Sequence, residues 1–229
     1  MREIVFDTET TGLNPAGGDR IVEIGCIEIY NRVETGRHFH AYFNPEREMP
    51  GDAEAVHGLT SNFLSDKPRF SESVEELLDF LEDSPLVAHN AAFDFGFLNF
   101  ELERCGCPVV SMSRMVDTLS LARSRHPGAK HSLDALCMRF GVDRSQRIKH
   151  GALLDAQLLA QVYVELTGGR QIGLGLVADT RAIQVETSAR PVIAREARPH
   201  VPAPEELERH RAFIAQLVNP LWARFAVVG

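Results

Sequence analysis

The sequence predicts an α/β fold with a mixed five-stranded sheet, followed by a linker and a C-terminal helix. Three observations predict this arrangement. Strand-like segments come first, with only short turns between them. Helix-like and strand-like segments then alternate as far as residue 168, and the composition changes after Gly169. A chain of 229 residues is long enough for one domain with a large core and a tail, or for two small domains.

The first three strands are expected to form an antiparallel meander. They are the apolar segments 3–8, 20–30 and 37–43, and the turns between them are too short for a crossover connection. A loop containing Pro and Gly follows. A doubly wound dinucleotide-binding sheet is the alternative, but it requires a helix after the first strand and a Gly-x-Gly-x-x-Gly turn. The sequence offers neither, so we exclude this alternative.

Helices and strands alternate in the next part of the chain. Val74, Leu77, Leu78 and Leu81 recur at helical spacing, which is typical of an amphipathic helix. The expected elements are a helix at 71–83, a strand at 85–89, a helix at 94–104, a strand at 115–119, a helix from a Ser132 cap to Phe140 that Gly141 ends, and a helix at 152–166 closed by Gly168-Gly169.

The chain after Gly169 is expected to hold a linker, residues 170–203, and a C-terminal segment, residues 204–229. Pro, Ala and Arg with almost no aromatic residue are typical of a linker. Residues 204–219 return to helical spacing, with Pro204 suited to the first turn. The apolar residues on one side of this helix are Leu207, Ile214, Leu217 and Leu221. A single helix has no core of its own to cover, so we expect this side to dock on a partner.

Composition excludes several classes of protein. The chain is 44% hydrophobic and 24% charged, which is ordinary for a globular protein. No apolar stretch approaches the roughly 20 residues of a membrane span, so no membrane partner is expected, and Met1 leads directly into a strand without a signal peptide. The cysteines lack the paired spacing of a zinc site, and we expect all four to be reduced in a cytosolic protein: Cys26, Cys105, Cys107 and Cys137.

The charge distribution is more informative than the net charge of −8. Residues 1–103 hold 21 acidic and 7 basic residues, whereas residues 104–149 hold 3 acidic and 9 basic ones. The basic segment is a candidate path for phosphates, and solvated surface charge is the alternative. The low net charge favours a short nucleic-acid footprint and weak binding. The candidate cations are Arg123, Arg125, Lys130, Arg139, Arg144, Arg147 and Lys149.

Two carboxylates stand at the end of the first strand. Asp7 and Glu9 are two residues apart, so in a strand they project from the same face. Glycine and Asn-Pro follow, which turns the chain away and leaves that end open. A helix N-cap beside a solvated acid is the alternative interpretation.

Three more residues have the chemistry of a catalytic site. Asp94 lies between two phenylalanines, and Asp155 lies near the apolar stripe of a helix. A salt bridge to a buried basic residue is the alternative for Asp155. His150 precedes it in a loop, and a histidine titrates near neutral pH as a general base requires. Carboxylates gathered in apolar surroundings repel one another, and a shared divalent metal removes that cost. The pattern therefore predicts a two-metal phosphodiesterase.

Together these residues resemble the DEDDh family of 3′-to-5′ exonucleases. The first motif is Asp7-x-Glu9-Thr-Thr-Gly, the second is His-Asn-Ala-Ala-Phe-Asp94, and the third is His150-x-x-x-x-Asp155. The sister subfamily has Tyr four residues before the last aspartate, where this chain has Gly151. The resemblance covers residues 1–168. It implies a ribonuclease H-like exonuclease domain over 1–169, with two Mg²⁺ or Mn²⁺ ions held by Asp7, Glu9, Asp94 and Asp155.

Within that family, the chain is similar to the epsilon-type proofreading subunits of bacterial DNA polymerase III. The segment Val56-His57-Gly-Leu-Thr resembles their nucleotide pocket, and Thr10, Leu13 and Phe93 match residues that hold the terminal base and sugar. Residues 171–176 resemble a sliding-clamp peptide through Gln171, Leu174 and Leu176, although Leu176 stands where Phe is preferred. By the same resemblance, residues 204–229 bind the replicative polymerase.

The resemblance implies a complete reaction. His150 deprotonates a water that attacks the last phosphodiester at the single-stranded 3′ end of DNA, and a nucleoside 5′-monophosphate leaves. A mismatched end unpairs at lower cost than a matched one, which gives selectivity. The protein is then expected in the bacterial cytoplasm, at the nucleoid. The alternatives are an RNA-directed exonuclease of the same family and a mainly structural subunit that joins polymerase and clamp.

Overall fold

The computed structural model describes residues 1–147, 149–169 and 202–218. The chain divides into two units, Met1–Gly175 and Leu176–Gly229, and each is described by itself. The first unit holds every residue of the expected catalytic set. The second unit contributes one described helix.

The sheet has five strands in the order β3-β2-β1-β4-β5. Strands β1, β2 and β3 pair antiparallel, which confirms the predicted meander, and β4 and β5 extend the sheet parallel to β1. A mixed five-stranded sheet is the predicted fold class, and the structure adds the strand order. The strands are β1 (Arg2–Thr10), β2 (Ile21–Tyr30), β3 (Val33–Tyr42), β4 (Leu86–Ala88) and β5 (Met115–Asp117).

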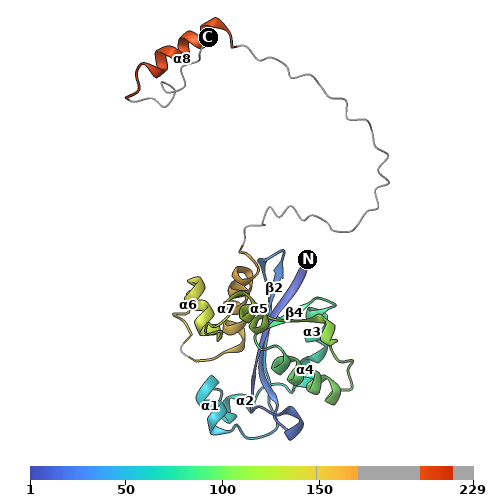
Figure 1. The fold of residues 1–229 in the computed structure, drawn as a ribbon. Coiled ribbons are helices and arrows are strands. Elements are labelled where there is room, and N and C mark those ends of the chain that lie inside the picture. Colours follow the sequence, from blue (N-terminus) through green and yellow to red (C-terminus); the bar gives the residue numbers. More distant parts are fainter. Residues whose placement is uncertain (148, 170–201, 219–229) are drawn as a thin grey trace, which may run out of the picture. The chain divides into compact units, whose positions relative to one another are not determined.

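Helices cover both faces of the sheet (Figure 1). Successive side chains of a strand point to opposite faces. Ile4 and Phe6 of β1 therefore join the core under α3 (Phe70–Leu81) and α4 (Ala92–Arg104). Val5 of the same strand joins the core under α7 (Ala152–Leu166), which packs on β1 and β2. Asp7 and Glu9 follow the odd-numbered register of Val5, so they belong to the α7 face.

The main helices lie where the sequence predicts them. Helix α6 (Leu133–Phe140) begins at Ser132, whose hydroxyl accepts a hydrogen bond from the Ala135 amide. It ends at Gly141, which has a φ of 68° in the left-handed region that glycine tolerates. Helices α3 and α4 each begin within two residues of the expected start. Two short 3-10 helices, Pro15–Gly17 and Met112–Arg114, complete the connections.

Three helices were missed by the sequence prediction. The segment expected as a loop before residue 71 holds α1 (Gly51–His57) and α2 (Ser61–Leu64), each with a single buried residue. Helix α5 (Thr118–Arg125) directly follows β5. Each is too short, or buries too few residues, to show an apolar period. The aspartate at position 117 was the available sequence signal, because aspartate is favoured at a helix N-cap. In the structure its side chain accepts from two amides of α5.

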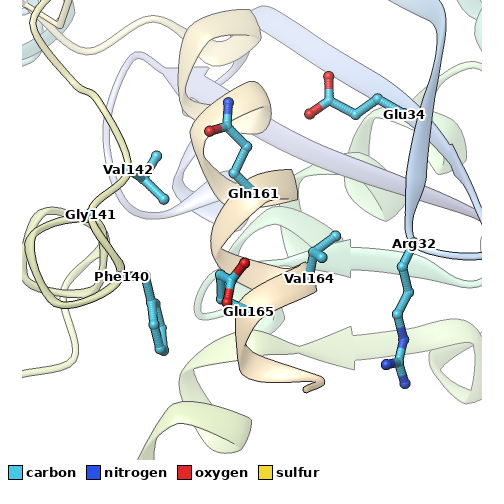
Figure 2. Close-up of a pocket in the computed structure, with 8 residues that line it drawn as sticks. All are labelled: Arg32, Glu34, Phe140, Gly141, Val142, Gln161, Val164 and Glu165. Atoms are coloured by element: carbon cyan, nitrogen blue, oxygen red, sulfur yellow. The ribbon is translucent and has the colours of Figure 1, made fainter. Parts of the chain in front are cut away.

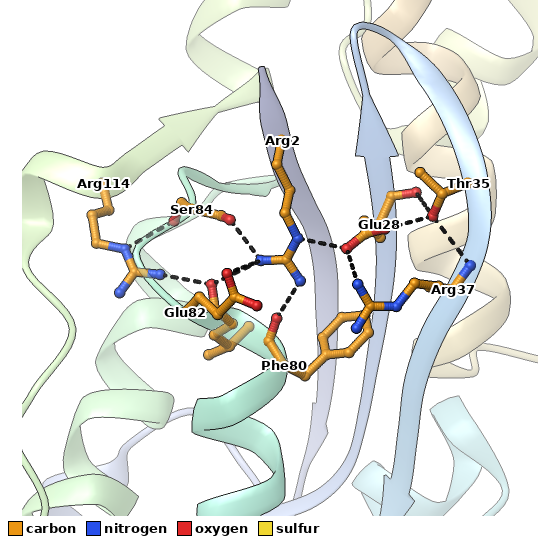
Figure 3. Close-up of polar contacts among 9 residues, drawn as sticks. Arg2, Glu28, Thr35, Arg37, Phe80, Glu82, Ser84 and Arg114 are labelled. Atoms are coloured by element: carbon orange, nitrogen blue, oxygen red, sulfur yellow. Dashed lines mark hydrogen bonds and ion pairs between the residues drawn. The ribbon is translucent and has the colours of Figure 1, made fainter.

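A polar network fastens the β1–β2–β3 meander to the end of α3 (Figure 3). The Arg2 guanidinium donates to Glu28 at 2.5 Å, to Ser84 at 2.7 Å and to the Phe80 carbonyl at 2.6 Å. Glu28 also accepts from Arg37 at 3.0 Å. These contacts satisfy a buried carboxylate, as a buried charge requires.

The described part of the second unit is residues 202–218, and it contains one helix, α8 (Pro204–Ile214). Pro204 occupies the first turn as predicted, and Glu206 accepts from the Ala203 amide at 3.0 Å. The prediction of a helix to residue 219 was too long, because α8 ends at Ile214 and Leu217 lies beyond it. Within this described segment Leu207 and Phe213 are exposed. Leu221 and Trp222 lie outside the described residues, as does the expected clamp peptide.

None of the helices in the described ranges has both the length and the apolarity of a membrane span. All four cysteines are unpaired, in agreement with their expected reduced state.

Candidate active site

The predicted carboxylates begin at the C-terminal end of β1. Asp7 is partly buried and Glu9 is buried, and both line one cleft at this end of the strand. A register shift between Glu9 and Thr10 ends the regular pairing with β2 just after them. The alternative of an N-cap beside a solvated acid is wrong, because both residues lie within the strand.

Asp94 reaches the same cleft from the first turn of α4. Strand β4 runs parallel to β1, so the helix that follows it starts beside the end of β1. Thr8 anchors the aspartate, since its amide and its hydroxyl donate to Asp94 Oδ1 at 3.1 and 2.7 Å. Asp117 fixes the turn before α4, because its side chain accepts hydrogen bonds from the amides of Asn90 and Ala91.

Asp155 lies in the first turn of α7 and is buried. The turn rests directly on β2 at Gly25, where a Cβ would lie 2.3 Å from the Leu153 backbone nitrogen. Gly25 pairs with Asp7 across the β1–β2 ladder. The absence of a side chain at Gly25 therefore lets α7 bring Asp155 next to Asp7.

His150 stands in the loop before α7, as predicted. Its side chain is 48% exposed, and its Nδ1 lies 3.3 Å from Asp155 Oδ2. Its amide donates to the Val56 carbonyl of α1 at 3.4 Å, which joins the loop to α1. Glu9, His150 and Asp155 each offer one atom that could bind a metal ion. These three atoms lie within 4.8 Å of one another, which is close enough for them to share an ion.

The five predicted catalytic residues thus line a single cleft of about 270 Å³. They come from β1, α4, α7 and the loop before α7, and span nearly 150 residues of sequence. The order of the elements brings them together because β1 and β4 are adjacent parallel strands and α7 crosses the meander.

Burial and mutual repulsion raise the proton affinity of these acids. Burial, then the charges of Asp94, Glu9 and Asp155, holds the pKa of Asp7 well above its usual range. Burial, then Asp155 and Glu23, raises the pKa of Glu9 to about 8. Burial raises the pKa of Asp94 to about 7, although the hydrogen bonds from Thr8 oppose the shift. A divalent cation removes this repulsion.

Arg147 is the cation that meets these acids in the structure. Its Nε donates to Asp155 Oδ1 at 2.5 Å and its Nη2 to Asp155 Oδ2 at 2.7 Å. Its Nη1 donates to Asp134 at 3.0 Å. The hydrogen bond to Asp155 raises the pKa of the guanidinium further. The salt bridge that was the alternative interpretation of Asp155 is therefore present in the structure. Arg147 contacts acidic side chains and does not line an open path for phosphates.

A second cleft, of about 560 Å³, adjoins the first. All five predicted substrate-binding residues line it: Thr10, Leu13, Val56, His57 and Phe93. Glu9 and Phe93 line both clefts, so the two are continuous. Leu13 is 84% exposed and Val56 is 48% exposed, which leaves apolar surface at the entrance.

His57 has an unusual environment for a buried side chain. The Leu59 amide donates to its Nδ1 at 3.0 Å, so Nδ1 is an acceptor and the hydrogen is on Nε2. Among the described residues Nε2 has no hydrogen-bond partner. Burial lowers the pKa of this histidine, which favours the neutral ring. His57 therefore carries a buried N–H beside the second cleft without an acceptor at hydrogen-bond distance among the described residues, and the Thr10 backbone near it opposes the lowering of its pKa.

Another cleft lies away from the carboxylates (Figure 2). It has a volume of about 210 Å³ and is lined by Arg32 and Glu34 of the β2–β3 hairpin and by Gln161, Val164 and Glu165 of α7. None of the predicted site residues lines it.

Comparisons with known proteins agree with this geometry. The family model described as Exonuclease, of the RNase T type, matches residues 4–163. A protein of Rickettsia felis named DNA polymerase III subunit epsilon is 48% identical over 230 residues, covering 96% of this chain and 98% of its own. The subunit of the same name from Escherichia coli is 41% identical, with coverages of 92% and 91%.

The chain belongs to the epsilon-like exonucleases of the DEDDh type. This epsilon-like exonuclease is a metal-dependent 3′-5′ exonuclease, and it has the five-stranded fold of its class. Exonuclease X in complex with 5′ overhanging duplex DNA is similar at 27% identity with a TM-score of 0.55, covering 72% of this chain and 90% of the other. The nuclease domain of 3′hExo, a DEDDh family member bound to rAMP, has the same fold at 16% identity, with a TM-score of 0.63 and coverages of 72% and 91%.

Several site residues of this exonuclease were missed from the sequence. Thr8 anchors Asp94, Gly25 admits α7, and Glu23 places a further buried carboxylate opposite Glu9 on β2. Arg147 was assigned only to the basic segment. A glycine inside an apolar strand indicates a close backbone approach, and that signal was available for Gly25.

Proposed function

We propose that this exonuclease is the proofreading subunit of a bacterial replicative DNA polymerase, which removes mismatched 3′-terminal nucleotides as 5′-monophosphates. One observation carries the proposal. All five residues expected for the chemistry line one cleft, in a chain that matches subunits named DNA polymerase III subunit epsilon over nearly its whole length.

The acidic residues of the cleft fit divalent metal ions. Asp7, Glu9, Asp94 and Asp155 offer carboxylate oxygens, which are the donors that Mg²⁺ and Mn²⁺ prefer. The raised pKa of Glu9, about 8, marks a site that favours added positive charge. These four residues would hold two ions, which supply a metal-activated water and stabilise the charge on the leaving oxygen.

His150 is the proposed general base. It is half exposed at the cleft entrance, whereas the carboxylates lie deeper, so it can accept a proton from a water that approaches from solvent. Its loop position leaves the ring free of the backbone constraints of a helix. Asp155 Oδ2 lies 3.3 Å from the Nδ1 of His150, so this carboxylate would stabilise the ring once it has taken up the proton.

The second cleft is the proposed site of the terminal nucleotide. Thr10, Leu13, Val56, His57 and Phe93 surround it, and it opens on Glu9 and the metal-binding cleft. The buried Nε2–H of His57 would find its acceptor on the nucleotide. A frayed end supplies a single-stranded terminus, and a mismatch frays more readily than a matched pair. Selection for mismatches then requires no recognition of the wrong base itself.

The C-terminal unit is the proposed polymerase-binding element. Leu207 and Phe213 of α8 are exposed, which suits a helix that docks on another protein. Residues 204–229 would tether the nuclease at high local concentration, which offsets the weak DNA binding expected at a net charge of −8. Gln171, Leu174 and Leu176 remain the proposed contacts of the sliding clamp. The protein then works in the cytoplasm, at the nucleoid.

This part of the proposal is tested by truncation. A fragment of residues 1–175 contains every proposed catalytic residue and should degrade single-stranded DNA as the full chain does. It should fail to bind the polymerase catalytic subunit in a pull-down. Equal capture of polymerase by the fragment and by the full chain would show that the tail has another role.

The proposal as a whole is tested with labelled substrates. The purified full chain is given a primer–template with a matched or a mismatched 3′ end, and single-stranded DNA and RNA of the same sequence. We expect Mg²⁺- or Mn²⁺-dependent release of nucleoside 5′-monophosphates, faster from the mismatched end and faster from DNA. Faster hydrolysis of RNA would favour the RNA-directed alternative. The absence of hydrolysis of every substrate would favour a structural subunit.

A further inference from the structure

The most informative contact outside the proposed mechanism is the one between Arg147 and Asp155. Both oxygens of Asp155 accept from the guanidinium, at 2.5 and 2.7 Å. This fork-to-carboxylate geometry is the strongest kind of side-chain ion pair. It occupies the carboxylate that the proposed function assigns to a metal ion. The metal and Arg147 therefore compete for the same oxygens.

We propose that Arg147 is the internal counter-ion of the metal site, which holds Asp155 and His150 in place in the metal-free protein and is displaced from Asp155 when a divalent ion binds. The inference rests on the metal site of the proposed function. Arg147 is in this account a positioning residue, because it acts through Asp155 and His150.

The charges of the cleft support the counter-ion role. Four carboxylates from β1, α4 and α7 line it, and Arg147 is the one lysine or arginine among the described residues that do so. The Arg147 side chain is only 9% exposed, so its pairing with Asp155 is shielded from water. Removing one partner of a shielded pair leaves the other charge uncompensated.

The same guanidinium also holds His150. Its Nη2 lies 3.0 Å from His150 Nδ1, and since a guanidinium can only donate, Nδ1 is the acceptor. One side chain thus fixes both the aspartate and the histidine of the third motif. This explains how the motif keeps its arrangement without an ion.

The structure also gives the displaced guanidinium a second partner. Arg147 Nη1 donates to Asp134 of α6 at 3.0 Å, and the Asp134 side chain is 45% exposed at the rim of the cleft. The long arginine side chain can turn toward Asp134 without a change of the backbone. Displacement therefore breaks the contact with Asp155 but keeps the existing contact with Asp134, so the guanidinium is not left as an unpaired buried charge.

The test is metal binding by the full chain, with Mn²⁺ as the probe and no nucleic acid. Isothermal titration calorimetry at fixed pH would compare the wild type with Arg147→Met, which keeps the aliphatic stem and removes the competitor. We expect Mn²⁺ to bind roughly ten- to a hundredfold more tightly to the variant, as loss of a charged hydrogen-bonded competitor predicts. Arg147→Lys, which keeps the charge without the fork, should fall between the two.

Thermal unfolding gives a second readout that does not depend on activity. In EDTA the Tm of Arg147→Met should be lower than that of the wild type by roughly 5 °C or more, because the acids lose their counter-ion. Saturating Mn²⁺ should remove most of that difference. Arg144→Met is the matched control, since Arg144 pairs with the same Asp134 at 2.7 Å but makes no contact with Asp155.

Weaker Mn²⁺ binding by Arg147→Met would overturn the inference, because it would mean that Arg147 supports the metal-bound arrangement. Unchanged affinity in that variant would overturn it as well. If the wild type itself binds no Mn²⁺, the proposed function fails and not merely this inference. Equal changes in Arg144→Met would assign the effect to surface charge and contradict a specific role for Arg147.

Discussion

Gly25 and Leu153 join strand β2 to helix α7 beside the carboxylate-lined cleft, through a direct contact between the two backbones. A Cβ on Gly25 would lie 2.3 Å from the Leu153 nitrogen and 2.4 Å from its Cα, which real structures do not tolerate. Gly25 is the ladder partner of Asp7, and Leu153 is two residues from Asp155. The distance between the two proposed metal ligands is therefore set at this contact.

Gly25→Ala should consequently impair the site more than the fold. The added methyl group has to push the first turn of α7 outward, at a cost of about 1–3 kcal/mol in the free energy of unfolding. A misplacement of about 1 Å at a catalytic group lowers rates by about 10²-fold. We expect a folded protein with that loss of hydrolysis, measured on single-stranded DNA together with urea unfolding.

Gly96→Ala is the matched control for this substitution. Gly96 lies in α4, two residues from Asp94, and a Cβ there would meet no atom within 4 Å. The variant should keep full activity and gain up to about 1 kcal/mol of stability, since alanine is the better helix former. Full activity in Gly25→Ala would show that the contact does not position Asp155.

Substitution of either of two proposed metal ligands, Asp7 and Asp155, should abolish activity, but the two substitutions should affect stability differently. Asp7→Asn removes one charge from a repelling cluster, so the metal-free protein should be as stable as the wild type or slightly more stable. Asp155→Asn leaves the Arg147 guanidinium without its bidentate partner, which should cost about 1–3 kcal/mol. Urea unfolding in EDTA separates the two cases. Hydrolysis at the wild-type rate by either variant would refute the metal-ligand assignment.

The metal-free protein should lose stability as the pH rises. Burial and repulsion raise the pKa of Glu9 to about 8 and that of Asp94 to about 7, so the folded state binds more protons than the unfolded state between about pH 4 and these values. The contribution of these two groups to the free energy of unfolding is therefore complete below about pH 4 and is lost as the pH rises toward 8. Unfolding in EDTA from pH 5.5 to 8.5 measures the slope.

Glu9→Gln should flatten that slope, because it removes one of the titrating groups. Glu75→Gln, at an exposed glutamate of α3, is the control and should leave the slope unchanged. A slope in Glu9→Gln equal to that of the wild type would mean that Glu9 is ionised in the folded protein throughout this range.

His150→Ala should lower kcat by about 10²–10⁴-fold, as loss of a general base predicts. It should spare Mn²⁺ affinity and flatten the acid limb of the pH–rate profile. His38→Ala, at an exposed histidine of β3, should change neither quantity. Weaker Mn²⁺ binding with an intact acid limb in His150→Ala would instead make His150 a metal ligand, which its place beside Glu9 and Asp155 permits.

The sequence predicted the sheet, and it predicted residues that the fold brings to one cleft, because both depend on local patterns. The period-two alternation of β1 placed Asp7 and Glu9 on one face, and helical spacing placed Asp155 on the buried side of α7. The short helices α1, α2 and α5 were missed because each buries too few residues to create a period.

Contacts between distant segments were beyond the reach of such patterns. The hydrogen bonds from Thr8 to Asp94 join residues 86 positions apart, and they depend on the parallel pairing of β1 with β4. The pairing of Arg147 with Asp155 depends on the path of the loop before α7. A list of basic residues in the sequence gives their charge but not the partner that each one meets.

Asp7, Glu9, Asp94 and Asp155 are proposed to hold two divalent ions together at the end of β1. Anomalous diffraction from crystals of the protein soaked with Mn²⁺ and a nucleoside 5′-monophosphate would locate these ions. We expect two manganese peaks among these four carboxylates, with the guanidinium of Arg147 moved away from Asp155. Manganese located elsewhere, or a cleft without manganese and with Arg147 still paired to Asp155 at saturating Mn²⁺, would contradict it.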